Sequence, residues 1–333
     1  MDITYEHDTL QPAVRPTLYF IGVTTGSSSI RRVFPLWAQE LGLSGVQLVG
    51  IDMPLHASPD TYRNVVAFIK DDPLSLGALV TTHKIDLYNA AVDLFDVVDP
   101  LAALMSEVSC ISKPNGILTA HAKDPISSGF ALEDFIPRGY WRDREADVFV
   151  MGAGGSAVAI SWYLTRPERG TDRPRRVVIS NRSQQRLASL RRVHDELKSD
   201  VPLELVHTPN PQDNDAVLQN LPEGSVIINA TGLGKDMPGS PLTDRARFPE
   251  NAIVWDLNYR GDLVFLAQAR SADAQLNVTV VDGWVYFLHG WTQVIAEVFG
   301  IEIPASGPSF DRLSELALSG KSESGTSMAT AGL

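Results

Sequence analysis

The chain has 333 residues, of which 44% are hydrophobic and 20% are charged, and its formal net charge is −12. This composition is typical of a globular protein and excludes collagen-like and disordered chains, while the length favours two domains. The negative charge disfavours binding to nucleic acid or an anionic membrane, and the single cysteine, Cys110, excludes an internal disulfide and a cysteine-rich metal site.

The first half of the chain alternates strand-like and helix-like segments. Continuous apolar runs indicate buried strands, and apolar residues at helical spacing indicate helices. Ser58 is suited to cap the second helix, and Pro59 to be its first residue. This alternation predicts βαβ units and a mostly parallel sheet. The predicted strands are 17–24, 46–53 and 76–82, and the predicted helices are 30–41, 59–70 and 85–94.

The segment 137–145 is polar and is interrupted by Pro and Gly, so we place a domain boundary near it. A second alternating series follows, again with short apolar runs that are typical of buried parallel strands. Its predicted strands are 147–151, 177–180, 203–207, 225–230, 252–257 and 278–281, and helices are predicted over 284–299 and 309–318.

The most specific local signal is the segment VFVMGAGGSAVAI, Val148 to Ile160. Gly152 permits a tight turn after the strand, Gly154 and Gly155 let the backbone approach a pyrophosphate, and Ala157 lets the next helix pack closely. The N–H groups and the dipole at the helix N-terminus would then face the anion. Packing alone also produces such turns, but the position between a strand and a helix favours dinucleotide binding.

The next predicted strand ends in Asn181, Arg182 and Ser183. A site that prefers NAD usually carries Asp or Glu here to bind the ribose 2′-hydroxyl. The planar guanidinium of Arg182 suits a phosphate instead, so NADP(H) is the predicted cofactor. The alternative is that Arg182 is a solvated surface residue.

Several segments together resemble the shikimate/quinate dehydrogenase family, in chain order from about Tyr19 to Phe299. Family members carry a GAGGxx turn, an NRT/S segment, a NATPxGM loop and a DLVYNP strand. The corresponding segments here are GAGGSA (152–157), SNRS (180–183), IINATGLG (227–234) and WDLNYRG (255–261). Gly232 replaces the usual Pro, and Lys235 replaces the usual Met.

The N-terminal half resembles the family more distantly. Ser27 and Ser29 stand where family members carry a Ser-x-Ser pair. The segment ALVTTHK resembles the NVTxPxK segment of the family, with Thr81 and Lys84 retained and the Asn missing. This half of the resemblance therefore rests on single residues more than on whole motifs.

Three further positions complete the comparison. Ser109 takes the place of the Asn in a GAVNT segment, and Asp124 is the Asp of an NTDxxG segment whose Asn is absent. Gln293 is the best match for a Gln on the last long helix of the family. Because a site that reads hydroxyl groups discriminates strongly through such polar contacts, we expect a substrate other than shikimate itself, or one bound differently.

The resemblance implies an α/β fold of two domains with a cleft between them. Residues 1–138, joined by 284–318, would bind the substrate on a mostly parallel sheet, and 139–283 would form a Rossmann-like domain that binds NADP. The implied activity is that of an NADP-dependent dehydrogenase or reductase acting on a CH–OH group of a small polar cyclic hydroxy or keto acid, or of a cyclitol-like compound. Residues 319–333 are rich in Ser, Gly, Thr and Ala and are predicted to be a flexible tail.

The resemblance also implies roles for individual residues. Lys84 and Asp124 would transfer the proton that accompanies hydride transfer. The implied substrate contacts are Ser27, Ser29, Thr81, Ser109, Tyr259 and Gln293. The implied cofactor contacts are Gly152, Ala153, Gly154, Gly155, Ser156, Asn181, Arg182, Ser183, Thr231, Gly232, Leu257 and Gly283.

Other interpretations of these residues stay open. Lys84 can be a solvated residue, Asp124 a turn residue before Pro125, and Ser27 and Ser29 caps of the helix that starts at residue 30. The sequence contains no HExxH motif or cysteine cluster, so no metal site is predicted, and the histidines 83, 121 and 289 are expected to be surface or hydrogen-bonded structural residues. The alternative function is a non-catalytic NADP(H)-binding sensor or regulatory protein, which the missing Asn residues favour.

The cellular setting can also be predicted. The N-terminal segment lacks a basic stretch followed by an apolar run, and no apolar stretch reaches the roughly 18 residues of a membrane span. We therefore expect a cytoplasmic protein with a small-molecule substrate and without a nucleic-acid or membrane partner. A homodimer is an assembly that the sequence leaves open.

Overall fold

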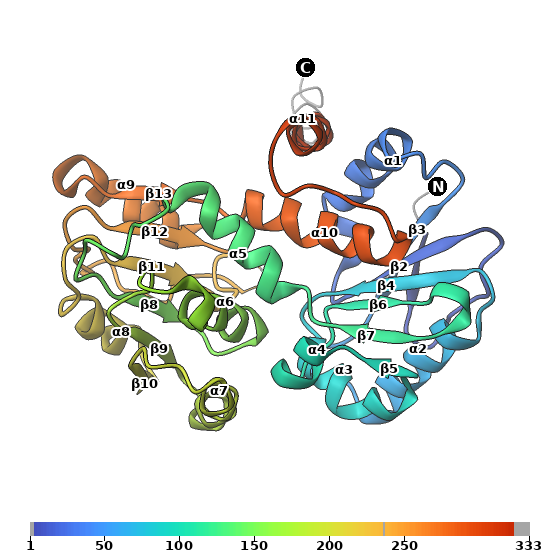
Figure 1. Cartoon of the computed structure of the whole chain (residues 1–333), viewed down its shortest axis with the longest axis horizontal. Coiled ribbons are helices and arrows are strands. Elements are labelled where there is room, and N and C mark those ends of the chain that lie inside the picture. The colour runs from blue at the N-terminus through green and yellow to red at the C-terminus, as the bar shows by residue number, and fades with distance from the viewer. Residues whose placement is uncertain (1–2, 236, 323–333) are drawn as a thin grey trace, which may run out of the picture. The chain divides into compact units, whose positions relative to one another are not determined.

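The computed structural model describes residues 3–235 and 237–322 and divides the chain into two compact units (Figure 1). Unit 1 comprises residues 1–123 and 290–333, and unit 2 comprises residues 124–289. The mixed α/β fold class with mostly parallel sheets is confirmed. The divisions fall after residues 123 and 289, whereas the sequence placed the domain boundaries after residues 138 and 283.

Within the described residues, unit 1 contains a seven-stranded sheet in the order β1-β3-β2-β4-β6-β7-β5. The first four strands in this order are parallel neighbours, whereas β6 runs antiparallel to both β4 and β7. The three predicted strands of this half correspond to β2, β3 and β4, with their ends shifted by one or two residues. The strands are β1 (Ile3–Glu6), β2 (Thr17–Gly22), β3 (Gln47–Asp52), β4 (Ser75–Val80), β5 (Val97–Val98), β6 (Cys110–Ser112) and β7 (Thr119–His121).

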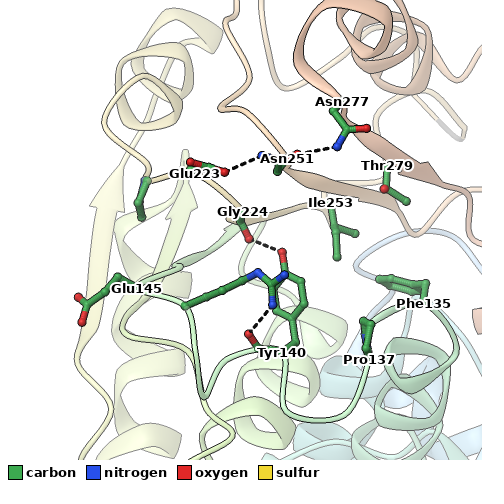
Figure 2. A pocket seen from close by; sticks show the side chains of 12 residues that line it. Phe135, Pro137, Tyr140, Glu145, Glu223, Gly224, Asn251, Ile253, Asn277 and Thr279 are labelled. Carbon is green, nitrogen blue, oxygen red and sulfur yellow. Dashed lines mark hydrogen bonds between the residues drawn. The ribbon is translucent and has the colours of Figure 1, made fainter.

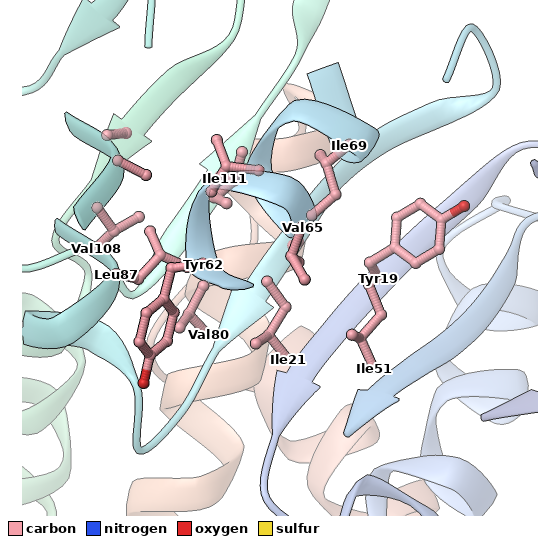
Figure 3. Close-up of a cluster of buried hydrophobic side chains, with 14 of the residues drawn as sticks. Tyr19, Ile21, Ile51, Tyr62, Val65, Ile69, Val80, Leu87, Val108 and Ile111 are labelled. Atoms are coloured by element: carbon pink, nitrogen blue, oxygen red, sulfur yellow. The ribbon is translucent and has the colours of Figure 1, made fainter. Parts of the chain in front are cut away.

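Side-chain alternation along β2 sends consecutive residues to opposite faces of the unit 1 sheet. Tyr19 and Ile21 join a buried apolar cluster with helices α2 and α3 (Figure 3). Phe20 points to the other face, where its ring meets the ring of Trp291 edge-on at 5.0 Å. Both faces of this strand are therefore covered, which explains its continuous apolar run. The helices of unit 1 are α1 (Ile30–Glu40), α2 (Pro59–Asp71), α3 (Lys84–Ala91), α4 (Pro100–Met105) and α11 (Pro308–Ser322).

The two predicted N-caps of unit 1 have different outcomes. Ser58 is extended, with φ −63° and ψ 152°, and its side chain accepts a hydrogen bond from the Thr61 N–H at 3.2 Å, so this cap is confirmed. Ser29 has helical angles, φ −56° and ψ −27°, and its side chain makes no capping bond. The Ser27 hydroxyl donates to the Thr24 carbonyl at 3.1 Å. The expectation that Ser27 or Ser29 caps α1 is wrong, because a capping residue needs the extended backbone that Ser58 has.

The predicted tail 319–333 begins inside a helix. Helix α11 continues to Ser322, so the flexible-tail prediction is wrong for residues 319–322, and residues 323–333 lie outside the described part of the chain. Contact with α1 stabilises this last helix: the indole N–H of Trp37 donates to the Leu313 carbonyl at 2.8 Å, and the Arg32 side chain donates to the Gly320 carbonyl at 2.8 Å.

Unit 2 contains, within the described residues, a six-stranded sheet that is parallel throughout. Its order, β10-β9-β8-β11-β12-β13, is that of a Rossmann fold, and the order reverses between β8 and β11. Ligands of such sheets bind outside the carboxyl ends of the strands at this reversal. The strands are β8 (Val148–Met151), β9 (Val177–Asn181), β10 (Leu203–His207), β11 (Val226–Asn229), β12 (Ile253–Asp256) and β13 (Thr279–Val281).

Helix α5 packs along α6 within unit 2. At their contact, a Cβ on Gly129 would lie 2.1 Å from the Tyr163 ring, so glycine lets the two helices approach closely. This contact groups α5 with unit 2 instead of with the residues before it. The helices of this part of the chain are α5 (Asp124–Phe135), α6 (Gly155–Thr165), α7 (Gln184–Leu197), α8 (Pro211–Leu218), α9 (Val264–Leu276) and α10 (Trp284–Phe299), and unit 2 ends within α10.

A buried carboxylate holds the amino end of β8. The Asp147 side chain is fully buried and accepts two hydrogen bonds from Arg175, both at 2.8 Å, and two from Arg176, at 3.0 and 2.7 Å. Charge-assisted bonds of this kind are the strong ones, and removing one partner of a buried pair leaves the other uncompensated.

We predict that Asp147→Asn lowers the free energy of unfolding by about 2–3 kcal/mol, because two guanidinium groups lose their shared counter-charge. Urea unfolding of both proteins measures this difference. The matched control is Asp200→Asn, which removes the partner of Arg173 at a carboxylate that is 78% exposed, and a much smaller change is expected there. Equal effects of the two substitutions would contradict the prediction.

Candidate active site

The glycine-rich turn after β8 has the geometry that close backbone approach requires. The Gly152 N–H donates to the Ser180 carbonyl at 2.8 Å, and its φ of +111° is a region that other residues rarely adopt. A Cβ on Gly152 would lie 2.5 Å from the Ala230 carbonyl oxygen, whereas a Cβ on Gly154 would have no neighbour within 4 Å. Helix α6 begins at Gly155. The turn is therefore tight on its protein side and open at Gly154, which fits a dinucleotide pyrophosphate.

The other predicted cofactor residues of unit 2 follow the carboxyl ends of its strands. Ala153 is buried, Ser156 is half-buried, and Gly232 has a φ of +77°. The Thr231 hydroxyl and N–H both donate to the Asn229 side chain, at 2.6 and 3.1 Å. All of these residues lie at the edge of the sheet where Rossmann folds bind ligands.

Two further predicted residues meet at the same edge. A Cβ on Gly283 would lie 2.0 Å from the Leu257 carbonyl oxygen, so the segments after β12 and β13 touch through their backbones. Tyr259 is half-buried, and its ring lies 5.3 Å from that of Trp284 and 5.0 Å from that of Phe287.

The segment after β9 is held in shape by its own polar side chains. The Asn181 side chain accepts from the Ser183 N–H at 2.7 Å, and the Ser183 hydroxyl caps α7 by accepting from the Arg186 N–H at 3.4 Å. Arg182 lies between them and is exposed, and its carbonyl accepts from His207 at 3.1 Å. The Arg182 guanidinium thus extends from a backbone that is held by hydrogen bonds. This backbone lies at the end of β9, next to β8, the strand that leads into the glycine turn.

In unit 1, three predicted residues lie at the carboxyl ends of β2 and β4. The Thr81 N–H and hydroxyl both donate to the Ile21 carbonyl, at 3.0 and 3.1 Å. Lys84 is half-buried, begins α3, and donates its N–H to the Thr81 carbonyl at 3.2 Å. The Ser109 carbonyl accepts from the Val80 N–H at 2.9 Å. The structure therefore brings Thr81, Lys84 and Ser109 to one edge of the unit 1 sheet.

The remaining predicted substrate residues of unit 1 lie elsewhere on it. Ser27 is exposed in the turn after β2, and Ser29 is buried before the first residue of α1. Gln293 is half-buried on α10. Their proposed contacts with a substrate stay predictions.

Asp124 is the first residue of α5, where its side chain is 7% exposed. The alternative that it is a plain turn residue before Pro125 is therefore wrong. Its Oδ2 accepts a hydrogen bond from the Tyr286 hydroxyl at 3.1 Å. Asp124 belongs to unit 2 and Lys84 to unit 1, so the action of the two as a pair stays a prediction.

The three histidines near these residues are buried. The Nδ1 atom of His83 lies 3.0 Å from the Tyr62 hydroxyl, and Nε2 of His121 lies 2.8 Å from the Ser112 hydroxyl. Burial lowers the pKa of both rings, and it lowers the pKa of His289 to about 4. His83 and His121 are therefore buried and hydrogen-bonded, and neither is a surface residue.

Sequence reasoning missed an ion pair beside Asp124. The Lys123 ammonium donates to Glu297 on α10, and the Lys123 N–H donates to the Ser109 hydroxyl oxygen at 2.7 Å. Burial raises the pKa of the Glu297 carboxyl, but the hydrogen bond from Lys123 and the charges of His121 and Lys123 together outweigh it, so the net pKa is lowered. The only sequence signal was the lysine itself, directly before the predicted Asp124.

It also missed Asp256, the last residue of β12. This carboxyl is fully buried and accepts from the Asn258 N–H at 2.9 Å and from the Asn229 side chain at 3.2 Å. Burial raises the pKa of Asp256 to about 6 despite these two donors. The group therefore changes its charge close to neutral pH at the edge of the sheet that carries the predicted cofactor residues.

A cavity of about 720 Å³ lies at the opposite edge of the unit 2 sheet. It opens where β12 and β13 begin, and the Tyr140 hydroxyl donates to the Gly224 carbonyl beneath it at 2.6 Å (Figure 2). Asn251 donates to Glu223 at 2.6 Å and accepts from Asn277 at 2.5 Å along its rim. None of the residues predicted for the site lines this cavity, so it is separate from the glycine turn.

No group of three or more His, Cys, Asp or Glu residues in the described part of the chain is arranged to hold a metal ion. Across residues 3–235 and 237–322, every helix is too short or too polar to cross a membrane.

We predict that Asp256 makes stability depend on pH. Its pKa is about 6 in the folded chain and about 4 when unfolded, so the folded state holds more protons between these values. The stabilisation is complete below about pH 4 and is lost as the pH rises through 6. The free energy of unfolding falls by about 2–3 kcal/mol over this range. Asp256→Asn should remove this dependence. Urea unfolding at pH 4, 5, 6 and 7 gives the difference between the two proteins, and a difference that does not change with pH would contradict the prediction.

No family model matches the chain. The sequence is 28% identical over 268 residues to the shikimate dehydrogenase (NADP(+)) of Sphingopyxis alaskensis. The aligned region spans 79% of this chain and 85% of that protein. It is 28% identical over 228 residues to the shikimate dehydrogenase (NADP(+)) of Methanothrix thermoacetophila, spanning 67% of this chain and 75% of that protein.

The fold is similar to that of solved enzymes. The quinate dehydrogenase of Corynebacterium glutamicum, solved in complex with NAD, superposes with a TM-score of 0.70 at 18% identity, over 92% of this chain and 99% of that chain. This likeness concerns the fold, whereas the sequence likenesses agree with the motifs quoted above. The resemblance is confirmed: the chain is similar in sequence to proteins named shikimate dehydrogenase (NADP(+)) and similar in fold to a quinate dehydrogenase.

Proposed function

We propose that the chain is a shikimate dehydrogenase-like oxidoreductase that uses NADP. The observation that carries this proposal is the turn at Gly152, which is closed against Ala230 and open at Gly154, at the reversal point of a Rossmann sheet. Two relatives named shikimate dehydrogenase (NADP(+)) support the same cofactor and reaction class. When bound, the cofactor supplies the hydride chemistry, and the protein supplies orientation and proton transfer.

The N-terminus of α6 is the proposed place of the cofactor pyrophosphate. The first N–H groups of a helix lack partners within the helix, and the helix dipole favours an anion there. Arg182 extends from the end of β9 and is the proposed partner of the ribose 2′-phosphate, because its exposed guanidinium can form two parallel bonds to phosphate oxygens.

Lys84 and Asp124 are the proposed proton-transfer groups. Lys84 is half-buried at the start of α3, beside Thr81 and Ser109 at the carboxyl edge of the unit 1 sheet. Asp124 is nearly buried at the start of α5. An alcohol oxygen must lose its proton as hydride leaves the carbon, and a positioned amine can accept it.

The proposed substrate is a small polar cyclic hydroxy or keto acid, or a cyclitol-like compound, that is not held as the family pattern implies. Ser109 supports this view, because its side chain is 2% exposed and its oxygen already accepts from the Lys123 N–H. A hydroxyl that is already hydrogen-bonded to the backbone has less hydrogen-bonding capacity left for a substrate than the Asn side-chain amide that it replaces in the family pattern.

We predict that Lys84→Ala lowers kcat by about 10²–10⁴-fold and leaves the Kd for NADP⁺ nearly unchanged, because the amine acts on the substrate and not on the cofactor. NADPH absorbance with shikimate, quinate and a panel of cyclitols measures turnover, and calorimetry measures the Kd. Lys70→Ala is the matched control, since its ammonium bonds the Leu94 carbonyl at 2.7 Å on the surface.

Two outcomes of this experiment would count against the proposal. Full activity of Lys84→Ala would remove the assignment of Lys84. No turnover of any compound by the unaltered protein, together with NADPH-dependent association with a partner, would favour the regulatory alternative.

We also predict that Arg182→Ala weakens NADP⁺ binding by about 10-fold and leaves NAD⁺ binding unchanged, because only NADP⁺ carries the phosphate that Arg182 would contact. Arg191→Ala, at an exposed residue of α7, is the control. Thermal stabilisation by each nucleotide provides an independent measurement. A Kd ratio near one for NADP⁺ and NAD⁺ in the unaltered protein would contradict the cofactor assignment.

A further inference from the structure

Tyr286 links two groups of unit 2 that the proposed function uses separately. It lies in the first turn of α10, and its hydroxyl donates to Oδ2 of Asp124 at 3.1 Å. The same oxygen lies 3.1 Å from the hydroxyl of Ser156, the second residue of α6. One phenol thus joins the carboxylate proposed for proton transfer to the turn proposed for the cofactor.

The direction of these two bonds follows from the chemistry of the groups. An ionised carboxylate can only accept, and a phenol has a single proton to donate. The Tyr286 proton therefore points to Asp124, so Ser156 must donate its own proton to the Tyr286 oxygen. The result is a directed chain from Ser156 through Tyr286 to Asp124.

The ring of Tyr286 is held by a buried neighbour. It meets the indole of Trp255 edge-on at 5.7 Å and 87°, and Trp255 is 1% exposed near the end of β12. The same indole also contacts the ring of Phe135, at 5.3 Å, at the end of the helix that Asp124 begins. The position of the Tyr286 hydroxyl is therefore set by the packing of its ring against a buried residue of the sheet.

We propose that Tyr286 is a positioning residue for the reaction, which orients the Asp124 carboxylate and fixes its distance from the cofactor turn at Ser156. This proposal rests on the proposed function. A proton-transfer group acts only within hydrogen-bond reach of its target, and a misplacement of about 1 Å can cost a factor of about 100 in rate. An oxygen that is bonded to both elements prevents such a misplacement within unit 2.

The test is Tyr286→Phe, which removes the hydroxyl and keeps the ring that packs on Trp255. We expect kcat to fall by about 10–100-fold, while the Kd for NADP⁺ changes by less than about twofold. The matched control is Tyr163→Phe, which removes another phenol that donates to a carboxylate of α5, Glu133, at 2.5 Å. The control should keep its kcat. An unchanged kcat in Tyr286→Phe would overturn the proposal.

A double substitution separates positioning from general stabilisation. If Tyr286 acts through Asp124, adding Tyr286→Phe to Asp124→Asn should lower kcat by less than about threefold further, because the group it positions is already lost. Independent, additive losses would overturn the proposal and leave Tyr286 with a structural role only.

A spectroscopic measurement tests the link between Tyr286 and Asp124 and does not require that the protein turn over a substrate. In protein labelled with ¹³C at the aspartate carboxyl carbons, Asp124→Asn identifies the Asp124 resonance by its loss. Tyr286→Phe should shift this resonance, and Tyr163→Phe should not. If the unaltered protein oxidises no substrate, the proposed function fails, yet this resonance still tests the link. An unmoved Asp124 resonance would overturn it.

Discussion

Unit 2 depends on the close approach of three backbone segments at Gly152. The Gly152 N–H donates to the Ser180 carbonyl of β9. The Cα hydrogen of Gly152 occupies the place where a side chain would meet the Ala230 carbonyl after β11. Three parallel strands can end side by side at this point because one residue has no Cβ. Two residues later, a Cβ on Gly154 would have no neighbour within 4 Å, so the turn is open directly before α6 begins.

The parallel sheets could be predicted from the sequence for a physical reason. Strands covered on both faces need apolar residues at every position, and β2 shows this with Phe20 against Trp291 and its two neighbours in the opposite cluster. The capping error at Ser29 has an equally physical cause, because its residue type suits a cap but its helical backbone does not. The grouping of α5 with unit 2 depends on the contact between Gly129 and Tyr163, which no local pattern reports.

The same distinction separates the local motifs that the sequence predicts from the contacts that it misses. The glycine turn and the segment 181–183 are local motifs whose geometry follows from neighbouring residues, so the sequence contained enough information. The roles of Tyr286 and Asp256 arise from contacts between distant segments. Tyr286 is 162 residues from Asp124, and Asp256 is 27 residues from Asn229. Neither contact leaves a spacing that could be recognised in a single sequence.

The division of the chain has a consequence for its synthesis. A ribosome completes residues 124–289 before it adds the second half of α10 and helix α11, which belong to unit 1. The carbonyl of Leu313, which accepts from the indole of Trp37, is made only after all of unit 2. Domains generally fold as units during translation. Part of the apolar surface of the nascent N-terminal sheet therefore stays uncovered until the rest of unit 1 is made. Unit 2, which is inserted between the two parts of unit 1, is complete before then and folds first.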